Sequence, residues 1–97
     1  MRLTVRYLNG KVAFTATPYQ ASAAKSVAAA GTSRFDIDIS KSGYTPLGVV
    51  GYDLQYGGLQ VVNIGLSSAS VATIWLYNAT NTAISPRPSV IVLYRPN

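Results

Sequence analysis

Hydrophobic and polar residues alternate with a period of two along most of this 97-residue chain, and turn residues separate the alternating runs. This period places successive side chains on opposite faces of a β-strand, so that one face can be buried and the other left in water. The first two runs predict strands near residues 2–8 and 11–17. Asn9-Gly10 lies between them, and both residues tolerate the positive φ angles of a tight turn. We therefore expect residues 2–17 to form a β-hairpin.

Further runs predict strands in the rest of the chain. They cover residues 33–40, 44–54, 59–66, 71–77 and 90–94. The run at 71–77 is rich in β-branched and aromatic residues, as is typical of a central strand. The run at 90–94 is apolar enough to be fully buried, and residues 95–97 are predicted to be a tail.

The strand predicted at 44–54 contains three residues that disturb regular pairing. Pro46 has no N–H to donate, which predicts that this strand begins at a sheet edge or at a bulge. Gly48 and Gly51 indicate a bend or a close approach of another backbone.

Residues 18–30 give two alternative predictions. The many alanines favour a short helical turn near residues 20–25, because alanine has the highest helix propensity. However, Pro18 precedes the segment, Gly31 follows it, and it has little apolar bulk to bury. A loop that leads into a short strand at 25–29 is the other interpretation.

This pattern predicts one all-β domain over residues 1–97, an antiparallel β-sandwich of the jelly-roll kind with seven or eight short strands. The length leaves no room for a second core. An immunoglobulin-like topology is the alternative, although the Cys…Trp…Cys spacing typical of that fold is absent from the sequence.

The composition argues against catalysis. The chain has no histidine, cysteine or glutamate, and its carboxylate side chains are Asp36, Asp38 and Asp53. General acid–base catalysis, covalent catalysis and zinc binding draw on the missing residue types. Asp36 and Asp38 share one strand face, but a solvated face neutralised by Arg34 is a simpler interpretation than a calcium site. We expect a protein that is not an enzyme and that uses no metal and no cofactor.

The charges also limit the classes of partner. The net charge is +5, but the eight basic residues are scattered, so we do not expect nucleic-acid binding. No apolar run approaches the roughly 18 residues of a membrane helix, so we expect no membrane insertion. Charged residues make up only 11% of the chain. Hydroxyls, amides and tyrosine rings must therefore supply the polar surface, and we expect a partner to cover part of it.

Aromatic residues and loop amides are the candidate ligand or interface residues. Aromatic rings stack on sugars and dominate many protein interfaces. Trp75 lies inside a strong strand, so core packing is the simpler interpretation of that residue. The tyrosines predicted near loops or strand ends are better placed for a ligand. The candidates are Tyr19, Tyr52, Tyr56, Trp75, Asn78 and Asn81.

Three stretches together resemble a known family. They are Ser26–Ser33 (SVAAAGTS), Ser42–Gly51 (SGYTPLGVVG) and Val90–Tyr94 (VIVLY). They resemble the distal head domains of phage tail-fibre and receptor-binding proteins, especially those of phages that infect gut bacteria. The resemblance implies a β-sandwich that assembles as a homotrimer on the virion, and that recognises a host surface or decorates the particle. It transfers no binding residues, because the contacts of these heads lie in variable loops.

The resemblance leads to one expected function and two alternatives. We expect a non-enzymatic phage virion surface domain, a homotrimeric tail-fibre head that binds a host-surface glycan or protein. The chain starts at Met1 directly in a predicted hairpin and not in an attachment shaft, so it is either an excised domain or a small complete protein. The second case favours a capsid decoration or head-fibre protein that attaches to capsid or tail proteins. A monomeric carbohydrate-binding module is the remaining alternative.

Overall fold

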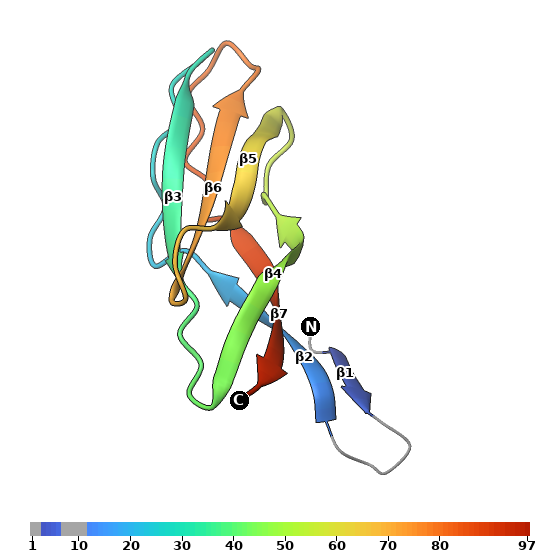
Figure 1. The fold of residues 1–97 in the computed structure, drawn as a ribbon. Coiled ribbons are helices and arrows are strands. Elements are labelled where there is room, and N and C mark those ends of the chain that lie inside the picture. The colour runs from blue at the N-terminus through green and yellow to red at the C-terminus, as the bar shows by residue number, and fades with distance from the viewer. Residues whose placement is uncertain (1–2, 7–11) are drawn as a thin grey trace.

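The computed structural model describes residues 3–6 and 12–97, and all regular structure in these residues is β-strand (Figure 1). The prediction of an all-β chain is confirmed. In chain order the strands are β1 (Leu3–Arg6), β2 (Val12–Gln20), β3 (Thr32–Asp38), β4 (Tyr44–Asp53), β5 (Leu59–Leu66), β6 (Val71–Asn78) and β7 (Ser89–Pro96). The molecule is elongated, with extents of 54 × 21 × 19 Å.

The strands form two antiparallel sheets, with the orders β1-β2-β7-β4 and β3-β6-β5. The chain crosses between the sheets after β2, β3, β4 and β6, so most neighbouring strands are not consecutive (Figure 1). For example, β2 pairs with β7, and β3 pairs with β6. The predicted central position of the strand at 71–77 is confirmed, because β6 lies between β3 and β5.

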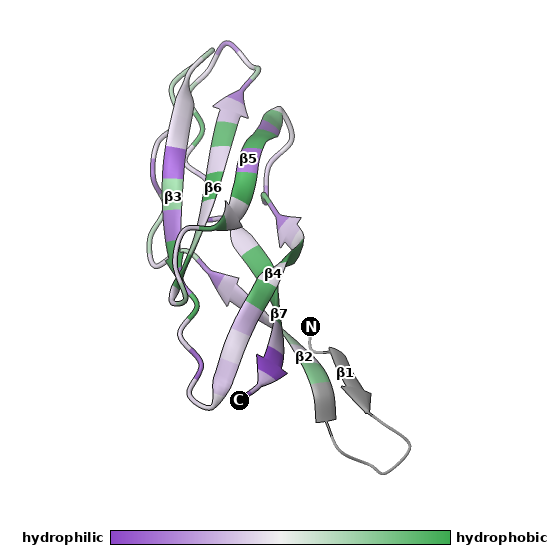
Figure 2. Cartoon of the chain, viewed as in Figure 1, coloured by the Kyte–Doolittle hydropathy of each residue, from purple (hydrophilic) through white to green (hydrophobic). Residues whose placement is uncertain are grey.

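One hydrophobic core collects side chains from both sheets, and period-two alternation decides which residues enter it. Phe35, Ile37 and the following Ile39 are buried, whereas Asp36 and Asp38 between them are exposed. The members of the core on β6 and β7 are Ala72, Ile74, Leu76, Val90, Val92 and Tyr94. Figure 2 shows the same alternation as hydrophobic and polar bands along the strands.

Tyr94 connects three segments within this core. Its ring packs edge to face against Tyr19 and Tyr44, with centroids 6.2 Å away in both pairs. Its hydroxyl donates a hydrogen bond to the carbonyl oxygen of Ile39 and lies 2.9 Å from the hydroxyl of Tyr19. Burial raises the pKa of Tyr94 well above that of a free tyrosine, because the charged form would lose its hydration. Tyr94 therefore ties β7 to β2 and to the connection between β3 and β4.

The predicted pairing of the first two strands is confirmed. β1 and β2 are antiparallel, with Leu3 opposite Ala16. The predicted turn at Asn9-Gly10 lies outside the described residues. β2 continues past the predicted end at residue 17, and Pro18 is paired with Ile91 of β7. Pro18 lies beyond the last residue that pairs with β1, so its missing N–H interrupts no ladder on that side.

The segment between β2 and β3 contains no helical turn; it is a loop, as the second interpretation predicted, but it lacks the strand expected at 25–29. It contains one isolated bridge, between Val27 and Ile84. The backbone N–H groups of Ala21 and Lys25 donate to the carbonyl oxygens of Pro88 and Pro86. The prolines of the segment before β7 have no N–H groups that could donate back to residues 21–31. The two segments are therefore hydrogen-bonded without forming a regular ladder.

The edge strands β4 and β5 contain three bulges. The register of β4 against β7 skips Leu47 and Val50, and that of β5 against β6 skips Val62. All three skipped side chains are exposed. The prediction that Pro46 lies at an edge or bulge is confirmed, because β4 is an edge strand and the first bulge begins at Pro46.

The end of the chain differs from the prediction of a tail after residue 94. β7 includes Arg95 and Pro96, which pair with Thr45 and Tyr44 at the start of β4. The strand is longer because β4 provides a pairing partner for these residues. The composition of residues 95–97 alone does not reveal this partner. The strand is also not fully buried, because Ile91 and Leu93 alternate with the buried residues and are partly exposed.

Candidate functional site

The outer face of the sheet β3-β6-β5 carries an aromatic stripe flanked by polar side chains. Because the strands pair in register, three rows of residues cross this face. The rows are Thr32–Tyr77–Gln60, Arg34–Trp75–Asn63 and Asp36–Thr73–Gly65. The central strand therefore supplies two aromatic rings, while its neighbours supply charged and amide groups.

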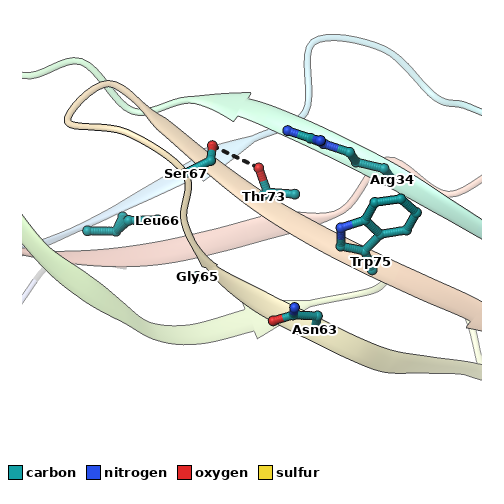
Figure 3. Close-up of a pocket in the computed structure, with 7 residues that line it drawn as sticks. All are labelled: Arg34, Asn63, Gly65, Leu66, Ser67, Thr73 and Trp75. Carbon is teal, nitrogen blue, oxygen red and sulfur yellow. Dashed lines mark hydrogen bonds between the residues drawn. The ribbon is translucent and has the colours of Figure 1, made fainter.

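A shallow hollow of about 240 Å³ lies beside the exposed face of Trp75. We call it the Trp75 hollow; its lining residues are Arg34, Asn63, Gly65, Leu66, Ser67, Thr73 and Trp75. Figure 3 shows the indole ring between Arg34 of β3 and Asn63 of β5. Gly65 has no side chain to fill the space, and nothing lies within 4 Å of where its Cβ would be. The missing side chain opposite Thr73 leaves room beside the ring.

Asp36 and Arg34 form an ion pair at the rim of the hollow. The Arg34 Nε donates to a carboxylate oxygen of Asp36 at 3.0 Å, and the Thr73 hydroxyl donates to the same oxygen at 2.7 Å. The Thr73 hydroxyl also lies 2.9 Å from that of Ser67 (Figure 3). The hydrogen bond from Thr73, and then that from Arg34, hold the pKa of Asp36 below its usual value. Asp36 is thus ionised and already accepts hydrogen bonds from Thr73 and Arg34, as expected for a solvated strand face.

Trp75 is not in the core, in contrast to the simpler interpretation of the sequence. Its side chain is on the outer face and is 37% exposed. The inner face of β6 is filled by Ala72, Ile74 and Leu76, which have the opposite parity. The Arg34 guanidinium lies 6.0 Å from the centre of the indole ring and lies beside its face. The parity of Trp75 with Thr73 was the sequence signal for an outward position.

Asn78 lies inside the protein, so the expectation that its side chain contacts a ligand or partner is wrong. It has the parity of Ile74 and Leu76 and is fully buried. Its Nδ2 donates to the carbonyl oxygens of Val27 at 3.0 Å and Thr82 at 2.9 Å. Its Oδ1 accepts from the N–H of Thr80 at 2.9 Å and from the Thr80 hydroxyl at 2.6 Å. Asn78 is a structural clamp for the loop after β6.

The structure does not bring the other candidates into one site. Tyr19 packs against the core and its hydroxyl lies beside that of Tyr94. Tyr52, at the end of β4, and Tyr56, in the turn after it, are each about half exposed. Asn81 is exposed in the loop after β6. Among the six candidates, Trp75 is the one that lines the hollow.

Among the described residues, histidine, cysteine, aspartate and glutamate side chains form no group of three or more that could hold a metal ion. The same part of the chain contains no helix that is long and apolar enough to span a membrane. No model of a protein family matches the chain, and no curated protein or solved structure matches it either. The function must therefore be inferred from the geometry of the site and from the resemblance described above.

Proposed function

We propose that this protein is a non-enzymatic phage virion surface domain that binds the host-cell surface through the outer face of β3-β6-β5. The observation that carries the proposal is the exposed indole of Trp75 beside a hollow lined by amide, hydroxyl and guanidinium groups. A large exposed ring surrounded by polar groups is typical of binding surfaces, because it combines apolar contact area with oriented hydrogen bonds.

The topology supports the jelly-roll part of this proposal. The pairs β2–β7 and β3–β6 are nested, as in a long hairpin, and the pairs β4–β7 and β5–β6 form when such a hairpin is rolled up. Immunoglobulin constant domains have the sheets A-B-E-D and C-F-G. In this chain the fifth and seventh strands have exchanged sheets relative to that pattern. We infer a reduced jelly-roll sandwich.

Assembly from copies of the chain is the second part of the proposal. The resemblance to tail-fibre heads implies a homotrimer. Exposed apolar residues on the edge strands support an interface outside the hollow, since Leu47, Val50 and Val62 would be covered by a neighbour. The same residues also favour the alternative of a capsid decoration or head-fibre protein, in which capsid or tail proteins would cover them.

Binding to bacterial cells tests the proposed function. Labelled protein, at the oligomeric state measured by light scattering, is incubated with a panel of gut bacterial strains. We expect saturable binding to at least one strain, and a loss of at least about tenfold in affinity for Trp75→Ala, as for a central aromatic contact. Ser42→Ala, in the exposed turn before β4 and away from this face, is the control and should bind normally.

Two results would contradict the proposal. One is the absence of binding to every strain, and the other is equal binding by Trp75→Ala. If deletion of the gene lowers the stability of the virion and leaves adsorption unchanged, the decoration protein is the better explanation.

A further inference from the structure

We infer that the Trp75 hollow binds one uncharged sugar ring of a host-surface glycan. This inference rests on the proposed function, since it names the ligand class of the same face. A sugar ring presents apolar C–H groups on its faces and hydroxyls around its rim. The hollow offers the matching arrangement, with the face of Trp75 on one side and polar groups around it.

The size of the hollow limits the ligand to about one ring. Its volume of about 240 Å³ is below the roughly 300–1,000 Å³ of pockets that enclose drug-sized ligands. The hollow is also open to solvent on the outer face of the sheet, so the rest of a glycan chain can continue away from it (Figure 3). A terminal or single projecting ring therefore fits better than a buried oligosaccharide.

The polar lining suits hydroxyl groups. The Asn63 amide can donate and accept hydrogen bonds, as can the hydroxyls of Ser67 and Thr73. A sugar hydroxyl can also donate and accept, so it can form hydrogen bonds with these three side chains either as the donor or as the acceptor. Arg34 adds donors only, and it already donates to Asp36.

The charge balance of the face selects an uncharged sugar. The ion pair with Asp36 at 3.0 Å compensates the positive charge of Arg34. Asp38 adds a second carboxylate to the exposed face of β3. The lowered pKa values of Asp36 and Asp38 keep both groups ionised at neutral pH. Lys25 is the next cation; its ammonium donates to the Arg34 carbonyl oxygen at 2.7 Å and lies outside the lining of the hollow. An acidic sugar would therefore find no unpaired cation in the lining, and would bind more weakly than its neutral counterpart.

Matched sugar pairs test the inference directly. Methyl galactoside and methyl glucoside are titrated into the protein alongside the corresponding methyl uronosides, which differ by a carboxylate. Nuclear magnetic resonance reports the Trp75 indole N–H signal. We expect at least one neutral sugar to shift this signal with millimolar affinity, and its uronoside to bind several-fold more weakly.

Two variants test the hollow separately, one by filling its volume and one by changing its charge. Gly65→Leu should fill it and abolish the shift, while the fold is kept because a side chain at Gly65 meets open space. Gly48→Leu is the matched control. Its Cβ also meets nothing within 4 Å, but Gly48 lies in the other sheet.

Asp36→Asn should release Arg34 from its ion pair and raise the affinity for the uronoside about fivefold, an effect that high salt removes.

The inference is overturned if the uronoside binds as tightly as the neutral sugar, if no neutral sugar shifts the indole signal, or if Gly65→Leu binds like the unmodified protein. These results are distinguishable from a failure of the proposed function. If Trp75→Ala loses binding to cells while no neutral sugar binds, the face still recognises a host surface but its ligand is of another class.

Discussion

The two faces of strand β6 share one backbone but have different surroundings. The inner face consists of Ala72, Ile74, Leu76 and Asn78, all of which are completely buried. The outer face carries Thr73, Trp75 and Tyr77, which are partly exposed. Residues that are adjacent in the sequence therefore divide between the core and the face that we propose for binding. A change on the inner face should affect folding, whereas its outer neighbour should affect binding.

The largest expected difference is between Ile74→Ala and Trp75→Ala. Ile74 is fully buried, and a cavity of this kind costs about 2–5 kcal/mol of unfolding free energy. Trp75→Ala should cost roughly 1 kcal/mol or less, because the ring packs against the outer surface only. Urea unfolding followed by fluorescence for Ile74→Ala, and by circular dichroism for Trp75→Ala, measures both. Equal destabilisation would remove the distinction between the faces.

Asn78→Ala tests whether a polar residue on the inner face acts like the apolar ones. The change removes the hydrogen bonds of Nδ2 to the carbonyl oxygens of Val27 and Thr82, and it leaves the N–H of Thr80 without a partner. We expect a loss of about 2–3 kcal/mol, since an unsatisfied buried group costs about 1–3 kcal/mol. Scanning calorimetry should show a clear fall in melting temperature. Asn81→Ala, in the exposed part of the same loop, should leave the melting temperature unchanged.

A pair of glycines tests how tightly the loop after β6, which Asn78 holds, is packed. Gly58 and Gly43 both have φ near +80°, so alanine is strained by about 1 kcal/mol at either position. A Cβ at Gly58 would also lie 2.3 Å from the Thr80 Cγ2, whereas one at Gly43 meets open space. Gly58→Ala should therefore be more destabilising, by about 1 kcal/mol or more. Equal melting temperatures would show that the loop held by Asn78 is loosely packed.

The smallest expected effect concerns pH and the outer face. The pKa of Asp36 is lowered in the folded protein, so its contribution to stability is present above the pKa of an unfolded aspartate, about 3.9. That contribution is lost as the pH falls through the lower folded value. Thr73→Val removes the main cause and should raise the pKa of Asp36 in a carbon-detected titration. The accompanying loss of stability at neutral pH should be below about 1 kcal/mol, as for exposed charged pairs.

Period-two alternation was sufficient to predict most of the strands. The predicted run at 33–40 overlaps β3, for example, and its alternating residues Phe35, Ile37 and Ile39 share the buried face. The same rule places Trp75 outward and Asn78 inward, but residue type was given more weight than parity at those two positions. Large rings are usually core residues and amides usually lie on the surface, so residue type and periodicity give opposite predictions for Trp75 and Asn78.

The pairing of distant strands could not be predicted from local pattern. Val90 and Tyr19 face each other across β7 and β2, although about seventy residues separate them. Such pairs depend on how the whole chain crosses between the sheets. The Trp75 hollow depends on this pairing too, because Arg34, Trp75 and Asn63 come from three strands. The sequence contains the residue types of the site, but it does not show that these residues lie next to one another in the fold.

The three bulges on the edge strands have a consequence for crowding. A sheet edge can recruit a strand from another molecule only where its N–H and C=O groups form an uninterrupted row. The skipped residues Leu47, Val50 and Val62 break that row on β4 and β5 while keeping their side chains exposed. Neighbouring molecules can therefore touch these edges through side chains without extending the sheet. If the protein is displayed in many copies on one particle, as proposed, these two edges would resist strand-to-strand aggregation.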